Sequence, residues 1–465
     1  MLKIYKHTGS WIGMIALLAL AVSCKKSFLE VKPKGKVIAS KTSDYDLLLN
    51  NLDLINIGAD GSIPMGDELV SIEPIWTGAS FRDKQLFQWK SDVYGADEDA
   101  KETLAPVKGL YVYNKIIAEV MDATNGTEAA KKSLQAEAYA GRAWTNFLLI
   151  NYYGKPYDPA TAATDPGFPI ITKADINTKN FTRASVQAVY EHIVSDLQTA
   201  IPNLSSVGPW HRIRMSKAAA KGVLAKVYVF MGRYPDALPV LNEALDDIDA
   251  STTTTKLVDF NTEFQGFPTV VNDYENVYAK TVFNSYTGTS NRVLWLKPEV
   301  AALYDSTDLR LQKWYITNTY PNGLTLYKRA NTFTTSIGVR VGELYLLRAE
   351  VKARLDDLQG AVADLEFFRK HRMPADKAMV PTNIATSKIP LLQFIMDERI
   401  REFATQGYRW FDMRRLSVDP LFGNKNFQHY VYSEAGEISQ TINFDNPEDF
   451  VFDIPPKILA ENPNF

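Results

Sequence analysis

Residues 222–245 read GVLAKVYVFMGRYPDALPVLNEAL, and this stretch carries the pattern that decides the fold. Apolar residues recur at helical spacing on both sides of Gly232, as they do in helices with one buried face. Gly232 stands where a helix should stop, since glycine readily adopts the left-handed conformation that ends helices. Ala225, Ala237 and Ala244 stand where two helices must approach closely. The stretch therefore predicts a helix, a tight turn and a second helix.

The same helix-pair pattern recurs along the chain. Residues 344–353 lead into 361–368, and residues 136–143 precede a more distant partner at 186–201. The repeat resembles tetratricopeptide helix pairs, in which each pair buries its apolar face only by stacking on the next. Because the match is degenerate, it predicts architecture and no specific function. We expect a mostly α fold built from helix pairs.

The N-terminus has the features of an export signal. Lysines precede an apolar run at residues 11–22, and Ser23 and Cys24 follow it. The run is too short to cross a hydrocarbon core as a helix, which takes about 20 residues. We therefore expect residues 1–23 to be a cleaved signal peptide.

Cys24 is the single cysteine of the 465-residue chain. The stretch LAVSC that it ends is similar to a bacterial lipobox, whose cysteine is acylated and becomes the first residue of the mature protein. We expect Cys24 to be lipidated, which leaves no free thiol and no disulfide scaffold in the mature chain. Several acyl chains on one cysteine give stable anchoring. The alternative is a plain secretory signal with a chance cysteine.

Composition and motifs argue against several classes of function. The formal net charge is −3 and the pI about 6.1, so the chain has no electrostatic footprint for nucleic acid. The five histidines are scattered, and the zinc-helix, nucleophile-elbow and phosphate-loop motifs do not occur. A motif search would not find the pair of carboxylates that a glycosidase uses, because the two need only a suitable separation in space. We expect no enzymatic activity, no cofactor and no metal, and we interpret the acidic runs at 97–99 and 246–249 as solvated faces.

Long polar and aromatic stretches separate the helical blocks, at residues 55–98, 154–182, 250–336 and 417–465. Loops of this length in a compact protein are usually functional or poorly ordered. A saccharide offers a CH face to stack on and hydroxyls to satisfy, so flat rings beside neutral polar groups suit it. Tight helix packing is the alternative use of any one ring.

We predict a shallow aromatic ligand site built from the stretches 55–98 and 250–336. Its expected stacking platforms are Trp76, Tyr286 and Trp314, and its expected hydrogen-bond partners are Arg82 and Asn291. These aromatic residues join no regular helical stripe, and loops held by a rigid scaffold are where binding groups concentrate. The stretch 154–182 is the alternative place for the site.

Motifs that follow one another along nearly the whole mature chain resemble those of the SusD/RagB family. They are SFLE at 27–30 with Pro33 nearby, AEAYAGRAWTNFLLINYYGKP at 136–156, DLR at 308–310, VGELYLLRAE at 341–350, ERIREFATQGYRWFDMRR at 398–415 and FDIPPKILAENP at 452–463. The stretch 398–415 is the most specific of them. These motifs look structural in the family, so we expect Arg409, Trp410 and Asp412 to form a buried hydrogen-bonded lock at the end of a helix.

The resemblance implies a fold and a place in the cell. The fold is mostly α, with four tetratricopeptide-like helix pairs in a right-handed superhelical body, packed against an irregular, loop-rich ligand-binding half. Residues 24–465 are expected to form one domain, with an N-terminal part at 24–200 and a C-terminal part at 201–465. The lipid on Cys24 would hold the protein at the outer membrane, facing outward.

The resemblance also implies a partner and a task. Members of the family cover a SusC-like, TonB-dependent transporter in the outer membrane and deliver oligosaccharides to it, and some branches deliver peptides. The expected function is therefore capture of an oligosaccharide for transport, with a peptide receptor of the same class as the alternative. A tetratricopeptide-type scaffold without a small ligand is the third hypothesis.

Overall fold

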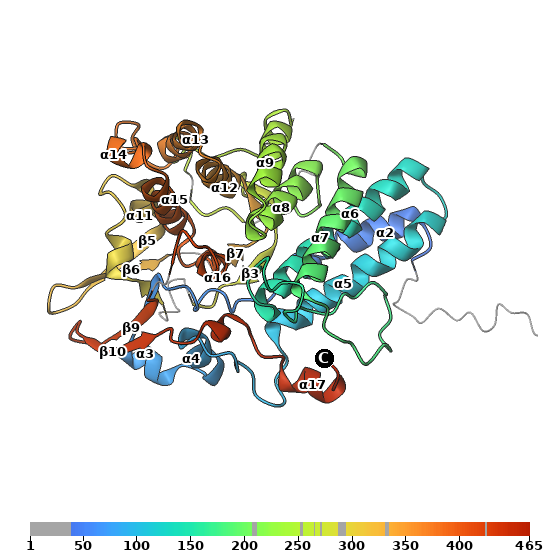
Figure 1. The fold of residues 1–465 in the computed structure, drawn as a ribbon, viewed down its shortest axis with the longest axis horizontal. Coiled ribbons are helices and arrows are strands. Elements are labelled where there is room, and N and C mark those ends of the chain that lie inside the picture. The colour runs from blue at the N-terminus through green and yellow to red at the C-terminus, as the bar shows by residue number, and fades with distance from the viewer. Residues whose placement is uncertain are drawn as a thin grey trace, which may run out of the picture.

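The computed structural model describes residues 39–206, 212–251, 254–264, 266–269, 272–286, 294–330, 334–423 and 426–465. Helices form an arc along one side of the molecule, and most strands lie on the other side (Figure 1). No helix within these ranges is both long enough and apolar enough to cross a membrane.

The arc is built from long helices that pack against their neighbours in sequence. They are α5 (Lys101–Glu119), α6 (Glu128–Tyr153), α7 (Val186–Ala200), α8 (Lys217–Phe230), α9 (Tyr234–Asp249), α12 (Val341–Arg354), α13 (Leu358–Lys370), α15 (Lys388–Phe403) and α16 (Tyr408–Ser417). The closest pairs are α5 with α6, α6 with α7, α8 with α9 and α12 with α13, and α9 and α15 both pack on α12. The predicted mostly α fold and its helix pairs are confirmed.

Shorter helices connect and cover these elements. They are α2 (Thr42–Leu49), α3 (Glu73–Gly78), α4 (Phe81–Phe87), α10 (Pro298–Ala301), α11 (Leu309–Trp314), α14 (Thr382–Ala385) and α17 (Pro456–Glu461), with 3₁₀ turns at Leu52–Leu54, Val120–Asp122, Ile201–Asn203 and Pro447–Phe450.

The α8/α9 pair shows how local sequence sets the helix boundaries. The hydroxyl of Ser216 accepts a hydrogen bond from the backbone N–H of Ala219 and so caps the start of α8. Gly232 has a φ of +69° in the turn, a conformation that costs glycine little. Ala225 and Ala237 are fully buried between the helices, as their small size predicts.

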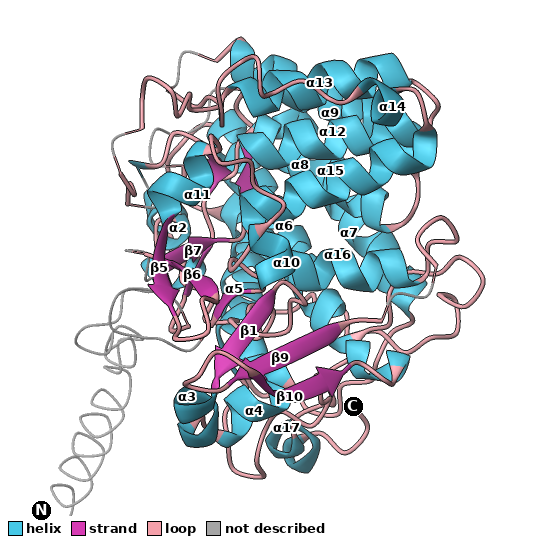
Figure 2. Cartoon of the chain, turned by 90° about the vertical axis from the view of Figure 1, so that its left-hand side faces the viewer, coloured by secondary structure: helices cyan, strands magenta, loops and turns pink. Residues whose placement is uncertain are grey.

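The strands form one larger sheet and two short ribbons. The sheet has the order β10-β9-β1-β4-β6-β5 and contains β1 (Leu69–Ile72), β4 (Trp295–Leu296), β5 (Tyr315–Thr319), β6 (Thr325–Arg329), β9 (Gln428–Tyr432) and β10 (Ile438–Asn443). One ribbon pairs β2 (Asn276–Tyr278) with β8 (Val339–Arg340), and the other pairs β3 (Thr281–Phe283) with β7 (Thr334–Ser336). Strands β1 and β9 are parallel, with Val70 opposite Tyr430, and β1, β9 and β10 lie side by side beyond the helices (Figure 2).

This sheet joins three of the four stretches that the sequence analysis read as long loops. Strand β1 comes from the stretch 55–98, β4 to β6 from 250–336, and β9 and β10 from 417–465. The prediction missed the sheet because its strands are short and pair across long sequence separations, where side-chain packing outweighs intrinsic strand propensity.

The motif at 398–415 is buried as expected, but of its three named residues only Arg409 and Asp412 are hydrogen-bonded, because the indole N–H of Trp410 has no partner among the described residues. Trp410 is fully buried, and Asp412 accepts hydrogen bonds from both Arg399 and Arg415. Arg409 reaches out of α16 to Asp67, with 3.1 Å between its Nη2 and Oδ2. The motif therefore connects α15, α16 and the start of β1.

Candidate functional site

A hollow lies where the ends of three sheet segments meet, and we call it the sheet-edge hollow. It encloses about 330 Å³ and is lined by Ile72, Pro74, Asn318, Thr319, Tyr320, Pro321 and Glu434. The turn between β5 and β6 touches the turn between β9 and β10, because the side-chain amide of Asn322 donates to the carbonyl oxygen of Gly436 at 2.8 Å. The hollow thus draws on the two stretches from which the sequence predicts the ligand site, and on 417–465 as well.

The lining of the sheet-edge hollow is mostly neutral and rich in hydrogen-bonding groups. Asn318 and Thr319 are exposed on the edge strand β5. Tyr320 is 8% exposed, and its hydroxyl has no hydrogen-bond partner among the described residues. The Tyr320 ring packs in an apolar cluster with Trp295 and Tyr432, and since buried polar groups are nearly always satisfied, its unpaired hydroxyl is consistent with a bound water or ligand. Glu434 is the one charged side chain among the lining residues described.

A tight turn positions these side chains. Residues 321–323 read Pro-Asn-Gly, and the side-chain oxygen of Asn322 accepts a hydrogen bond from the N–H of Leu324. Gly323 has a φ of +88°, which favours glycine. The sequence analysis missed Asn318 and Thr319 as candidates. An Asn-Gly pair between two runs rich in β-branched and aromatic residues is a strong hairpin signal and would have placed both residues at a strand end.

Trp76 lies on α3, which follows β1 directly. Its ring is half-buried against Phe87, with 5.2 Å between the ring centroids. Its indole N–H donates to the side-chain oxygen of Gln440 on β10 at 3.0 Å. Trp76 therefore lies close to the edge of the sheet, and its indole N–H is already used by the protein.

The structure brings Arg82 and Tyr286 together, but inside the protein. Tyr286 is 2% exposed, and its hydroxyl lies 3.4 Å from Arg82 Nη1. Arg82 forms ion pairs with Asp60 at 2.8 Å and Glu102 at 2.6 Å. Burial alone would lower the pKa of Arg82, but the carboxylates of Glu102 and Asp60 raise it above its usual value. This cluster has an evident structural role.

Trp314 lies apart from these residues, in a separate apolar cluster. It is 5% exposed, and the ring of Phe260 packs edge-on against it at 5.4 Å. The guanidinium carbon of Arg329 lies 4.3 Å from the centre of the Trp314 ring. Trp314 nevertheless lines another cavity, described further below.

Two of the predicted residues, Asn291 and Cys24, lie outside the described residues. The ligand-binding roles of Trp76, Arg82, Tyr286, Asn291 and Trp314 therefore stay predictions. In the conformation described, Tyr286 and Trp314 are each too covered for a sugar ring to stack on them, and Arg82 is buried and already paired with Asp60 and Glu102. An open neutral surface is found instead at the sheet-edge hollow.

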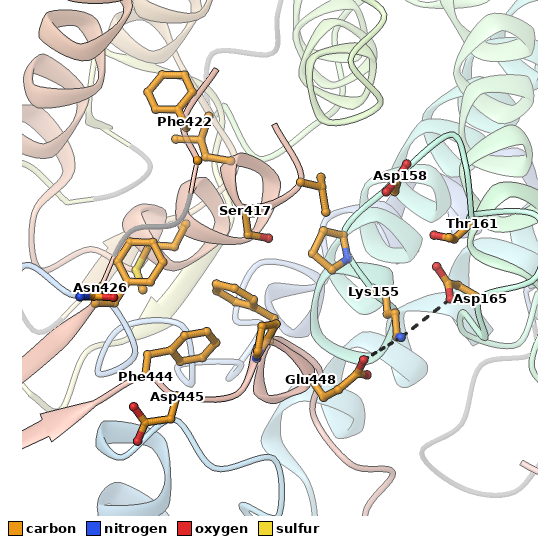
Figure 3. A pocket seen from close by; sticks show the side chains of 18 of the residues that line it. Lys155, Asp158, Thr161, Asp165, Ser417, Phe422, Asn426, Phe444, Asp445 and Glu448 are labelled. Atoms are coloured by element: carbon orange, nitrogen blue, oxygen red, sulfur yellow. Dashed lines mark hydrogen bonds and ion pairs between the residues drawn. The ribbon is translucent and has the colours of Figure 1, made fainter. Parts of the chain in front are cut away.

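A larger hollow of about 520 Å³ lies between the loop after α6 and the C-terminal stretch (Figure 3). Lys155 bridges its rim, with Nζ 2.9 Å from Glu448 Oε1 and 4.0 Å from Asp165 Oδ1. The hydrogen bond to Glu448 raises the pKa of Lys155. Phe450 and Phe422 line this hollow but are 2% and 8% exposed, so their faces are mostly covered. Its charged rim and covered rings suit a neutral saccharide less well than the sheet-edge hollow does.

Comparison with known proteins connects this fold to one group. A family model described as "Starch-binding associating with outer membrane" matches residues 27–229. The chain is also 25% identical over 395 residues to the SusD-like protein P2 of Formosa agariphila, covering 73% of this chain and 74% of that protein.

Solved structures agree on the architecture. A SusD superfamily protein of Bacteroides vulgatus has a TM-score of 0.72 and 19% identity, covering 91% of this chain and 98% of that one. A SusD-like carbohydrate binding protein of the same organism has a TM-score of 0.70 and 16% identity, covering 91% of this chain and 97% of that one. At these identities the likeness shows the fold alone.

Proposed function

We propose, from the premise that this chain belongs to the SusD-like family, that it captures a saccharide at the cell surface and delivers it to an outer-membrane transporter. The family is described as starch-binding and associated with the outer membrane. The observation that carries the proposal is the sheet-edge hollow, whose lining combines the neutral polar side chains of Asn318 and Thr319 with Tyr320, a buried residue whose hydroxyl has no partner among the described residues.

The hollow suits binding without chemistry. Asn318 and Thr319 offer neutral donors and acceptors to sugar hydroxyls, and Pro74 and Ile72 offer apolar surface to a CH face. A single carboxylate, Glu434, lines it among the described residues, whereas glycoside hydrolysis normally needs a pair. We therefore propose a binding protein and not an enzyme.

The anchor and the partner are parts of the same proposal. Residues 1–23 would be removed, Cys24 would carry the lipid, and the mature chain 24–465 would act as one unit at the outer membrane. A SusC-like, TonB-dependent transporter would receive the ligand. The lipobox-like sequence and the description of the matched family support this arrangement.

The test is a glycan array, followed by calorimetry of the full-length chain in detergent with the best glycan. Asn318→Ala and Tyr320→Ala should each weaken binding about tenfold or more, since anchor contacts are typically worth about 1 to 3 kcal/mol. Asn443→Ala is the matched control, because Asn443 is exposed on the same sheet and does not line the hollow. Circular dichroism checks folding.

Wild-type affinity in both hollow variants would move the site to Trp76 or to the stretch 154–182. If peptides bind and no glycan does, the peptide receptor of the same class replaces the saccharide receptor. Co-purification with a TonB-dependent transporter from the native membrane tests the partner.

A further inference from the structure

A buried arginine that has no carboxylate partner among the described residues lines a third cavity, which we call the Arg329 cavity. It encloses about 490 Å³ between α11, the end of β6 and the described residues of 258–264, 266–268 and 272–275. Arg329 is 6% exposed and lines it. Its Nη1 has no hydrogen-bond partner among the described residues. A buried guanidinium in this state is unfavourable unless something compensates its charge.

The internal segments outside the described ranges offer no carboxylate that could pair with Arg329. None of the ion pairs among the described residues includes Arg329. The internal segments outside the described ranges contain no Asp or Glu at all, and Glu30 is the one acidic residue before residue 39. Arg329 does contact the side chain of Tyr315, which lies opposite it across β5 and β6, but that hydroxyl is neutral.

The other charged residues that line the cavity are already paired. Arg340 holds Asp273 at 2.9 Å and Glu275 at 3.1 Å. Glu263 is paired with Lys256 at 2.7 Å. Glu275 is also paired with Arg372 at 2.7 Å. Each carboxylate that lines the cavity therefore has a cationic partner, so Arg329 is the charged lining residue without a described counter-ion, and the cavity should attract an anion to it.

Aromatic rings hold the guanidinium in place. The guanidinium carbon of Arg329 lies over the Trp314 ring, 4.3 Å from its centre, and 6.0 Å from the centre of the Phe267 ring. Stacking uses the face of the guanidinium and leaves its edge for in-plane hydrogen bonds, which match the two oxygens of a carboxylate or sulfate. Phe264 and the partly exposed Tyr274 add apolar wall beside this edge.

We propose that the Arg329 cavity binds the carboxylate or sulfate group of an acidic saccharide unit, with Arg329 as the anion ligand and the neighbouring rings packed against the sugar. The anion site stands on the geometry, whereas the choice of a saccharide rests on the proposed function. Trp314 then belongs to a ligand site as the support of Arg329 and not as a stacking platform of its own.

The site is separate from the sheet-edge hollow. Trp314 and Arg329 lie at one end of the β5–β6 hairpin, and Tyr320 lies at its turn. The five residues of β5 between them span roughly 17 Å at about 3.4 Å per residue. The effect of a substitution at one site on ligand binding can therefore be measured without disturbing the other site.

The test is to measure binding of D-glucuronate, glucose 6-sulfate and glucose to the full-length chain in detergent by saturation-transfer NMR. At least one anionic probe should bind tenfold or more tightly than glucose, and added NaCl should weaken it. Arg329→Gln should abolish this preference. Arg233→Gln is the control, because Arg233 is a partly exposed arginine paired with Asp236 in the α8/α9 turn.

An unchanged preference in Arg329→Gln, or no preference in the wild type, would overturn the proposal. If Arg329→Gln does not fold, Arg329→Lys decides, since an ammonium keeps the charge and loses the fork. The anionic probe that the wild type prefers should then lose at least tenfold in affinity, and unchanged affinity overturns the site. Acetate and sulfate ions that bind as tightly as the sugar probes would overturn the saccharide assignment alone, independently of binding at the sheet-edge hollow.

Discussion

Arg415 on α16 meets Glu350 on α12 in a two-point contact, with 2.7 Å between Nη1 and Oε1 and 2.8 Å between Nη2 and Oε2. Both side chains are buried. Arg415 also donates to Asp412, and Glu350 also accepts from Arg354. The contact therefore ties the most specific motif of the sequence to the centre of the helical arc.

Removing one partner of this pair should be strongly destabilising. Glu350→Ala removes the carboxylate that Arg415 contacts and leaves part of its buried positive charge uncompensated. Breaking a buried ion pair typically costs about 3 to 5 kcal/mol. Urea denaturation followed by circular dichroism measures the loss. The double variant Glu350→Met with Arg415→Met should lose less, because Arg354 keeps Asp419 and Asp412 keeps Arg399. A double variant as unstable as the single one would contradict the argument.

Trp410 should be a structural residue and not a ligand contact. It is fully buried, and its ring centroid lies 5.1 Å from that of Phe450. Trp410→Ala should lower the free energy of unfolding by about 3 to 5 kcal/mol. Trp410→Phe keeps part of the packing and should cost less. If Trp410→Ala kept the wild-type melting temperature and lost ligand, this assignment would be wrong.

Glu68 should make stability fall as the pH rises. Burial, together with the carboxylate of Asp67, raises the pKa of Glu68 from 4.5 to about 8. Between pH 4.5 and 8 the folded state holds a proton that the unfolded state has lost, so stability falls by up to about 1.4 kcal/mol per pH unit. Glu68→Gln should remove this slope, and its advantage over the wild type should be greater at pH 8 than at pH 5.

Urea titrations at both pH values measure this difference. The glutamine can still accept the hydrogen bond from the N–H of Thr405, which the Glu68 carboxylate accepts at 3.2 Å. Glu461→Gln, on the exposed helix α17, is the control and should leave the pH profile unchanged. Parallel profiles for wild type and Glu68→Gln would show that this carboxyl is ionised in the folded state.

Cys24→Ala should release a folded protein from the membrane fraction, because several acyl chains on one cysteine give stable anchoring and none would remain. Fractionation with immunoblotting measures the distribution, and circular dichroism of the released protein checks the fold. Unchanged retention in the membrane would contradict the lipid anchor.

The helical half of the molecule could be predicted because its signal is local. The pairs α8/α9 and α12/α13 lie where the spacing of apolar residues placed them, and Gly232 lies in the turn that it predicts. Apolar residues recur every three to four positions along a helix with one buried face, so a short window of sequence contains the whole pattern. The buried setting of Trp410 was implied by the resemblance of its motif to that of the SusD/RagB family and not by helical spacing.

The strand-rich half depended on contacts that no window of sequence contains. Arg82 appeared to be a free hydrogen-bonding group, but the fold places it beside Asp60, Glu102 and Tyr286, which neutralise and cover it. Arg329 is not among the candidate residues predicted from sequence. In the fold it is buried, and its Nη1 has no hydrogen-bond partner among the described residues. Whether a charge is paired or a ring covered depends on neighbours far away in the chain. Sequence therefore determined where the long paired helices lie, whereas tertiary structure decided the short helices and strands between them and which polar groups stay unpaired.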